Sequence, residues 1–424
     1  MKSNKHLRRY LNLLEKDYLK AIISDMAQRF DFSEKSWICQ TIINKFTEIL
    51  EKFEQHNNIE RLKPGEILLP YKDNLITVPL IDLKTMEILA DTKLFPPYKK
   101  RTIDKVFAIL KNINKQATID DVYSLISPRE TVPRYQKGDD FNDVKIDESF
   151  PLIKPADIGV ELNKSIPTII SLPTDIKNSL IDYCIDQLGL KPFVAKNLLE
   201  YFLEKRAYYM PLKNSIKPGQ LIWLGSSIKK AHKPEHLFLK RKQIPIILTL
   251  YTKEELESRP KDLAELNVIM MNQLARITTE AYLQETLLPL DELQLFYLRS
   301  SYVLSKLIRK YMSKNKIILP TPGTILDSGT MFTHKELVVD LAMQGYYTKE
   351  IAKKLYHDPR SIDAYLKVFN SVLILWYFDL PPDLISMVTE KGITVVKEHI
   401  NIIKKYFPDK NSVQNYLNIH GISL

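Results

Sequence analysis

Glycine and cysteine are both scarce in this chain. Only 11 of its 424 residues are glycine, and neither a glycine-rich phosphate loop nor a Gly-x-Ser-x-Gly motif is present. The usual sequence signs of a nucleotide-dependent enzyme and of an α/β hydrolase are therefore missing. The two cysteines, Cys39 and Cys184, stand in separate segments without a Cys-x-x-Cys pair. This usage fits a reducing cytoplasm and supplies no zinc framework.

Long apolar runs are absent as well. The longest, Val372–Phe378, has seven residues, far fewer than a membrane span needs. Residues 1–10 are basic but lack the apolar core of a signal peptide. We therefore expect a cytoplasmic protein without a membrane segment, associated with the nucleoid if it binds DNA.

The charge of the chain points to an acidic partner. The formal net charge is +10 and the pI is about 9.1, and nucleic acid is the commonest partner of such a protein. An apolar fraction of 45% with 26% charged residues is typical of a globular chain, and the length predicts two to four domains.

Hydrophobic periodicity predicts a mainly α fold with small β modules, an α+β class. Helical stripes cover residues 7–55, and short strands are expected at 66–71 and 75–83. The same order returns after residue 173: two helices, a Lys-Pro-Gly turn and two short apolar strands. We interpret the N-terminal half as a duplicated helices-plus-small-β module, with chance reuse of turn chemistry as the alternative.

Two sequence matches support the duplication. Lys63-Pro-Gly-Glu66 resembles Lys217-Pro-Gly-Gln220, and Val78-Pro79 resembles Ile244-Pro245. A proline inside a strand has no N–H for a neighbour, so these strands are expected at sheet edges or in small curled sheets. The expected domains are residues 1–127, a linker at 128–173, the second copy at 174–262, a winged helix-turn-helix at 263–330, and a further helix-turn-helix with a C-terminal helical region at 331–424.

Gly345–Phe369 has the pattern of a helix-turn-helix. Thr348 is expected to cap the first helix, residues 356–358 form the turn, and Pro359 fits the first position of the second helix. An ordinary pair of packed helices is the alternative. The residues expected on the free side of the second helix, within reach of base edges, are Arg360, Ser361, Ala364 and Lys367.

Residues 290–326 predict another such unit, with strands at 317–319 and 324–326 as a wing. No acidic residue occurs between Glu292 and Asp327, as neutralisation of DNA phosphates would favour. The residues expected to contact DNA are Arg299, Ser301, Tyr302, Lys306, Arg309, Lys310, Lys314 and Lys316. A third helix pair at 382–406 is interpreted as a packing or dimer element.

Residues 226–243 form a basic insert in the second β module. It is expected either to contact phosphate or to be an ordinary solvated loop. Its cations are Lys229, Lys230, Lys233, Lys240, Arg241 and Lys242.

The order of several landmarks from Lys217 to Phe407 resembles the prokaryotic domain-of-unknown-function family 1670. They are Pro218-Gly219-Gln220, Ile244–Leu250, Arg276–Tyr282, Leu287-Leu288, Pro320–Gly323, Ser328-Gly329, His334-Lys335 and Tyr365–Phe369. The resemblance implies DNA binding through helix-turn-helix segments, in a regulatory or mobile-element role, and implies no catalytic residues. The chain departs from the family at Leu298, where a turn glycine is frequent, and at Val303–Lys306, which is less basic than usual.

We therefore expect a sequence-specific binder of double-stranded DNA, a transcriptional or mobile-element regulator that also forms homodimers, and not an enzyme. Neither cofactor nor metal is expected. A nuclease or transposase using Asp120-Asp121 or Asp139-Asp140 and a helical scaffold that binds only protein are the alternatives. His232 and His236 stand four residues apart but have no third ligand nearby in the sequence.

Overall fold

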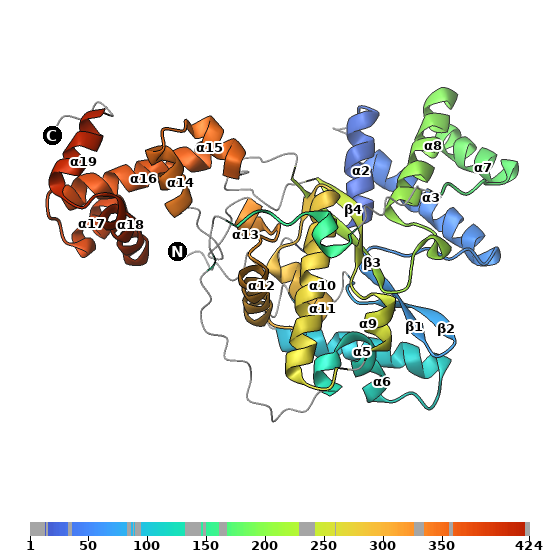
Figure 1. Ribbon diagram of the computed structural model, residues 1–424. Helices are drawn as coiled ribbons and strands as arrows, with labels where there is room; N and C mark the ends of the chain where they lie inside the picture. The colour runs from blue at the N-terminus through green and yellow to red at the C-terminus, as the bar shows by residue number, and fades with distance from the viewer. Residues whose placement is uncertain are drawn as a thin grey trace. The chain divides into compact units, whose positions relative to one another are not determined.

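The computed structural model describes residues 13, 16–32, 36–82, 86, 87, 89, 95–131, 146, 150–160, 168–228, 242–258, 260–325, 335–355 and 359–419. The chain divides into two compact units (Figure 1). Unit 1 comprises Met1–Ile146 and Leu152–Pro320, and unit 2 comprises Asp147–Pro151 and Thr321–Leu424. Helices dominate, and one small antiparallel sheet lies in unit 1, which confirms the expected α+β class. The finer division into five segments stays a prediction.

Four helices of unit 1 share one apolar core. They are α2 (Tyr18–Arg29), α3 (Ser36–His56), α7 (Thr174–Asp186) and α8 (Pro192–Tyr209). Helix α3 places Cys39, Ile42, Ile43 and Phe46 on one buried stripe, as the helical period requires. The Phe46 and Phe202 rings meet edge to face at 5.5 Å between centroids. Segments about 150 residues apart in the sequence therefore fold as one bundle (Figure 1).

The sheet is built from one hairpin of each predicted copy. Its strands are β1 (Glu66–Tyr71), β2 (Asn74–Pro79), β3 (Gln220–Ser227) and β4 (Gln243–Thr249), in the order β2-β1-β3-β4, with β5 (Thr286–Leu287) on β3. The hairpins meet at Ile67 opposite Leu221. The strands β2 and β4, which contain Pro79 and Pro245, are the outer strands, as expected, but the inner strand β1 contains a proline as well, Pro70.

Two reciprocal hydrogen bonds join the hairpins. Gly65 N donates to Ile222 O at 2.7 Å, and Gly219 N donates to Leu68 O at 2.6 Å. Both glycines have a positive φ, +93° at Gly65 and +83° at Gly219. Neither position has room for a side chain, because a Cβ would lie 2.1 Å from Ile81 O at Gly65 and 1.9 Å from Tyr251 O at Gly219. The two Lys-Pro-Gly turns thus have matching geometry, while descent from one duplicated module stays a prediction.

The second sequence match does not hold in the strand register. Pro79 lies opposite Glu66 at the end of its hairpin, whereas Pro245 lies opposite Leu224 in the middle of the other. Counted from the turn glycines, the residue that corresponds to Pro79 is Thr249. The similarity of Val78-Pro79 to Ile244-Pro245 reflects shared strand composition and not shared position.

The remaining elements of unit 1 lie around the sheet. Among them α5 contacts β2 and α10 contacts β4, while α12 contacts α10 and α11. Their bounds are α5 (Phe95–Ile113), α6 (Ile119–Ile126), η2 (Pro128–Thr131), η3 (Pro155–Ile158), η4 (Lys213–Ser215), α9 (Lys253–Glu257), α10 (Leu263–Leu283), α11 (Leu290–Tyr297) and α12 (Ser301–Asn315).

The predicted wing after α12 is wrong. Ile318 forms a parallel bridge with Leu152 from the segment expected to be a linker, and Pro322–Ile325 is a short helix, α13. Pro322 has no N–H to give a ladder but fits a first helical turn. Thr321 N donates to Thr324 Oγ1 at 2.8 Å, and Thr324 N donates to Thr321 Oγ1 at 3.3 Å, so the turn is capped as a helix.

Unit 2 contains two adjoining cores that share one long helix. Its helices after α13 are α14 (Lys335–Met343), α15 (Thr348–Leu355), α16 (Pro359–Tyr377), α17 (Pro382–Thr389), α18 (Ile393–Tyr406) and α19 (Lys410–Ile419). The first half of α16 packs with α14 and α15 around Ile351 and Ile362. Its second half contributes Val372 and Leu373 to a core with α17, α18 and α19.

Candidate nucleic-acid interface

Helices α11 and α12 are joined by a turn of three residues. Leu298 ends α11 in the left-handed conformation, with φ of 49°, at the position where the resemblance led us to expect a glycine. Ser300 caps α12, because its Oγ accepts from Val303 N at 3.4 Å. The buried residues Leu304, Leu307 and Ile308 hold α12 against α10 and α11. The sequence correctly predicted this helix pair, and of Ser300 and Ser301, both candidates for the cap, the structure has Ser300.

The eight site residues predicted from the sequence all lie on α12 or directly beside it. Tyr302 is 65% exposed, and Lys314 and Lys316 are exposed too. Ser301, Lys306, Lys310, Arg309 and Arg299 are half-buried, and the Nε of Arg309 is buried. Tyr302, Lys306 and Arg309 follow at helical spacing on one face. The Lys306 ammonium lies 4.5 Å from the centre of the Tyr302 ring.

Glu292, the acid that precedes the acid-free stretch, adds no surface charge. Its Oε1 lies 2.6 Å from Lys16 Nζ, and its Oε2 accepts from Trp223 Nε1 at 2.7 Å. Both charged side chains are at most 2% exposed. Burial lowers the pKa of Lys16 and raises that of Glu292, while the attraction between them opposes both shifts. The pair ties α11 to β3 and to the N-terminal segment.

Another carboxylate approaches α12 from a distant part of the sequence. Tyr311, on α12, has a pKa raised first by burial and then by the charge of Asp157 in η3. Asp157 is exposed, and its Oδ2 accepts from Lys154 N at 2.9 Å. Because η3 belongs to the segment expected to be a linker, the effect of this acid on a residue of α12 was not predicted from the sequence.

The second predicted unit forms three packed helices, α14, α15 and α16. Ala352 of α15 is 4% exposed and lies in the same core as Ile362 of α16. Thr348 was expected to cap α15, but it is the first residue of that helix. Its hydroxyl donates to Asp363 Oδ1 on α16 at 2.9 Å, so it links the two helices instead. The carboxylate of Glu350 accepts from Tyr347 N at 3.0 Å and takes the capping role.

The predicted base-reading side of α16 is described in part. Ala364 and Lys367 are exposed, as expected. Arg360 and Ser361 lie in the first turn of the helix, but their side chains are outside the described residues, as is the predicted turn at 356–358. Asp363, which the sequence analysis did not include, is exposed between Ala364 and that first turn.

Most of the basic insert also lies outside the described residues, namely Lys229, Lys230, Lys233, Lys240 and Arg241. Lys242 is described, and its Nζ forms an ion pair with Asp25 of α2 at 3.2 Å. One of the six cations predicted to contact phosphate is therefore paired with a carboxylate of the protein itself. His232, His236, Asp139 and Asp140 fall outside the described residues as well.

Asp121, one of the acids considered for a nuclease, caps a helix. Its Oδ2 accepts from Thr118 N at 2.7 Å, and Asp121 N donates to Thr118 Oγ1 at 3.4 Å, which completes a capping box on α6. Within the described ranges no group of three or more His, Cys, Asp or Glu side chains is placed to hold a metal ion. In the same ranges no helix has both the length and the apolar character needed to cross a bilayer.

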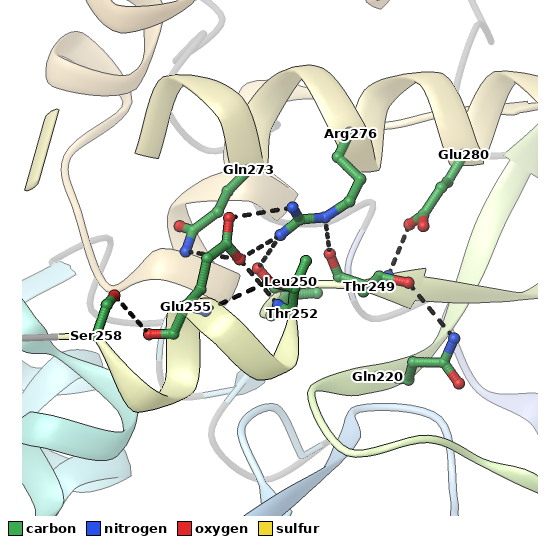
Figure 2. A network of polar contacts seen from close by, with 9 residues as sticks. All are labelled: Gln220, Thr249, Leu250, Thr252, Glu255, Ser258, Gln273, Arg276 and Glu280. Atoms are coloured by element: carbon green, nitrogen blue, oxygen red, sulfur yellow. Dashed lines mark hydrogen bonds and ion pairs between the residues drawn. The ribbon is translucent and has the colours of Figure 1, made fainter. Parts of the chain in front are cut away.

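A polar network around Arg276 contains landmarks that the sequence analysis noted without assigning a role (Figure 2). The Arg276 guanidinium donates to Thr249 O at 2.8 Å and Leu250 O at 3.0 Å, and it pairs with Glu255 of α9 at 2.6 Å. Glu280, one turn further along α10, accepts from Thr249 N at 2.6 Å. These side chains satisfy the outer edge of β4, so they fix α10 on the sheet. Their role in this network is structural.

Comparison with known proteins identifies a family. Residues 188–402, half of the chain, match the family described as protein of unknown function (DUF1670). The match runs from just before α8 to within α18 and includes both predicted DNA-contacting helix pairs. Neither a curated protein nor a solved structure matches the chain. The landmarks on β3, β4 and α10–α13 are thus those of a known family, and the chain belongs to the DUF1670 family.

Proposed function

We propose that this protein binds double-stranded DNA with sequence preference and regulates transcription or a mobile element. The observation that carries the proposal is helix α12. It follows α11 after a three-residue turn, and it presents Tyr302, Lys306 and Arg309 on one face. From residue 293 to residue 326 the chain has six cations and no acid. A one-signed helix after a tight turn is suited to lie against the phosphates of a groove.

The second helix pair, α15 and α16, supports the proposal in a different way. Ala364 is small and exposed near the start of α16, and Lys367 is exposed one turn further on. A recognition helix needs such short side chains where its backbone comes close to base edges. The Asp363 carboxylate is held by Thr348, 2.9 Å away, and a carboxylate so placed can accept from the N4 amino group of cytosine.

The two helix pairs therefore have different proposed roles. The cations of α12 contribute most of the affinity, since contacts with phosphate are independent of sequence. The residues of α16, with Arg360 in the first turn, contribute base selection. Such a protein acts in the cytoplasm, on the nucleoid. The proposal assigns binding and no catalysis.

The test measures binding of the full chain to a fluorescent random-sequence duplex. If about four phosphates are neutralised, affinity should fall about 100-fold between 50 and 200 mM salt. The double variant Lys314→Ala/Lys316→Ala should weaken binding to every sequence and reduce the salt dependence. Lys196→Ala, an exposed cation on α8, is the matched control and should bind like the wild type.

Sequence preference is measured by selection from a randomised duplex pool. Arg360→Ala should relax the selected sequence and leave the salt dependence almost unchanged, because it contributes to base contacts. Absence of binding at low salt would end the DNA proposal. Strand cleavage in magnesium or manganese that is abolished by substituting Asp139 and Asp140 would replace it with the nuclease alternative.

A further inference from the structure

Helix α17 in unit 2 exposes an apolar stripe. Met387 is 69% exposed, Val388 55% and Leu384 38%, while Ile385 on the opposite side is fully buried. At 100° per residue, the exposed side chains of α17 itself, Asp383, Leu384, Met387 and Val388, fall within one sector of the helix. A buried anchor on one side and a continuous apolar stripe on the other distinguish α17 from a helix that merely carries scattered surface residues.

The stripe is bounded by opposite charges. Asp383 lies in the first turn of α17, and Lys391 follows its C-terminal end. Both side chains are exposed, and within the described part of unit 2 neither forms a hydrogen bond or an ion pair. They stand four residues before and four after Met387. Lys391 lies beyond the helix, since α17 ends at Thr389 and the left-handed, exposed Glu390 stands between them.

This spacing makes the stripe complementary to itself. We consider a second α17 that packs antiparallel, with the two Met387 side chains at the centre. A helical position before Met387 in one copy then faces the position equally far after Met387 in the other. Asp383 of each copy then lies at the end that carries Lys391 of the other copy, and the apolar side chains meet between these two ends. A two-fold axis generates such an isologous contact, in which both copies use the same surface.

The end of α17 is held in place for this contact. Glu390 adopts the left-handed conformation with φ of 53°, and Lys391 N donates to Ser386 O at 3.2 Å. The hydroxyl of Ser386 donates to Lys391 O at 2.6 Å. The backbone of Lys391 is therefore fixed before any partner arrives, which reduces the entropy lost on binding.

We propose that α17 is a homodimer interface, and that its occupant is α17 of a second copy of this chain. The mixed charge at its two ends fits a second α17 and does not fit the one-signed surface of nucleic acid or an anionic membrane. The stripe is small, so the dimer should be weak in solution and reinforced when both copies bind neighbouring sites on one molecule.

The experiment is sedimentation equilibrium of the full chain without DNA, over a range of concentrations. The wild type should show a reversible monomer–dimer equilibrium. Met387→Asp should raise the dimer dissociation constant at least tenfold, as expected for a residue at the centre of an interface. The control, Asn401→Asp, adds the same charge at an exposed position of α18 and should leave the equilibrium unchanged. Far-ultraviolet circular dichroism verifies that each variant is folded.

A charge exchange tests the orientation and does not depend on Met387. Asp383→Lys and Lys391→Asp should each weaken the dimer, and the double variant should regain most of the lost affinity. A chain that stays monomeric at all concentrations would overturn the proposal, as would a dimer that Met387→Asp leaves intact. Failure of the double variant to recover would overturn the antiparallel pairing. None of these results depends on DNA binding, so they separate this inference from the proposed function.

Discussion

The left-handed residue between α11 and α12 gives a prediction in which two opposing effects can be weighed. Leu298 has φ of 49°, a conformation that costs a side-chain-bearing residue about 1–2 kcal/mol relative to glycine. Its side chain, however, is 1% exposed. Removal of a buried leucine side chain typically costs about 3–5 kcal/mol, and the added freedom of glycine in the unfolded chain costs about 0.5–1 kcal/mol more. We expect Leu298→Gly to destabilise unit 1 by about 3 kcal/mol, the relief of strain being smaller than the loss of burial.

Lys316 supplies the matched control at the other end of α12. It is also left-handed, with φ of 54°, but its side chain is exposed. Lys316→Gly therefore loses no buried side chain, and only strain relief and unfolded-state entropy remain. The difference between these two predicts stabilisation of about 0.5–1 kcal/mol. Substitution by glycine should thus destabilise the protein at the start of α12 and stabilise it at the end of the same helix.

The assay is urea unfolding followed by the fluorescence of Trp223. This tryptophan is buried in unit 1, with its ring 5.3 Å from that of Phe296 on α11. Replacement of Trp37, which is exposed, and Trp376, which lies in unit 2, by phenylalanine leaves Trp223 as the single reporter. An increase in stability for Leu298→Gly would show that burial of the side chain does not dominate. A loss for Lys316→Gly would refute the strain argument.

Two further predictions concern unit 1. Glu54 pairs with Arg206 at 2.6 Å and Arg61 at 2.7 Å; burial raises its pKa, but the two arginines outweigh burial and hold it below the usual 4.5. The contribution of ionised Glu54 to stability is therefore present above about pH 4.5 and is lost as the pH falls through its lower folded-state pKa. Glu54→Gln should reduce the free energy of unfolding by about 3 kcal/mol at pH 7. It should also make the urea midpoint depend less on pH in the acid range. An unchanged acid limb would count against the pair. Gly65→Ala and Gly219→Ala should both destabilise the sheet, by at least about 2 kcal/mol, because each needs positive φ and each Cβ would overlap a carbonyl oxygen. The free energy of unfolding of each variant is measured by urea unfolding. A variant as stable as the wild type would contradict the prediction for that glycine.

The sequence predicted helices well where one period dominates. The buried stripe of Ile38, Ile42, Phe46 and Leu50 in α3 depends on local spacing, which is visible in consecutive residues, although Trp37, expected on the same stripe, is exposed. The outer positions of β2 and β4 agree with the rule that a proline removes a backbone donor, whereas Pro70 in the inner strand β1 shows that a proline alone does not identify an edge.

Contacts between distant segments were not accessible. The alternation at 317–326 suggested a wing, yet Leu152, more than 160 residues earlier, pairs with Ile318, and the threonines around Pro322 favour a capped helical turn. The burial of Glu292 was not predicted, because nothing near it in the sequence identifies Lys16 as its partner. The position of Asp157 near α12 was hidden for the same reason.

The sheet has a consequence for where this protein can be divided. The family match begins at residue 188, after β1, β2 and the helices α2, α3 and α7. Yet β1 lies beside β3, α3 shares a core with α8, and the partner of Glu292 is Lys16. A fragment limited to the matched residues would expose a strand edge and an apolar helix face, and it would leave a buried carboxylate uncompensated. The region that matches the family is thus not a folding unit here: its stability depends on the residues that precede it.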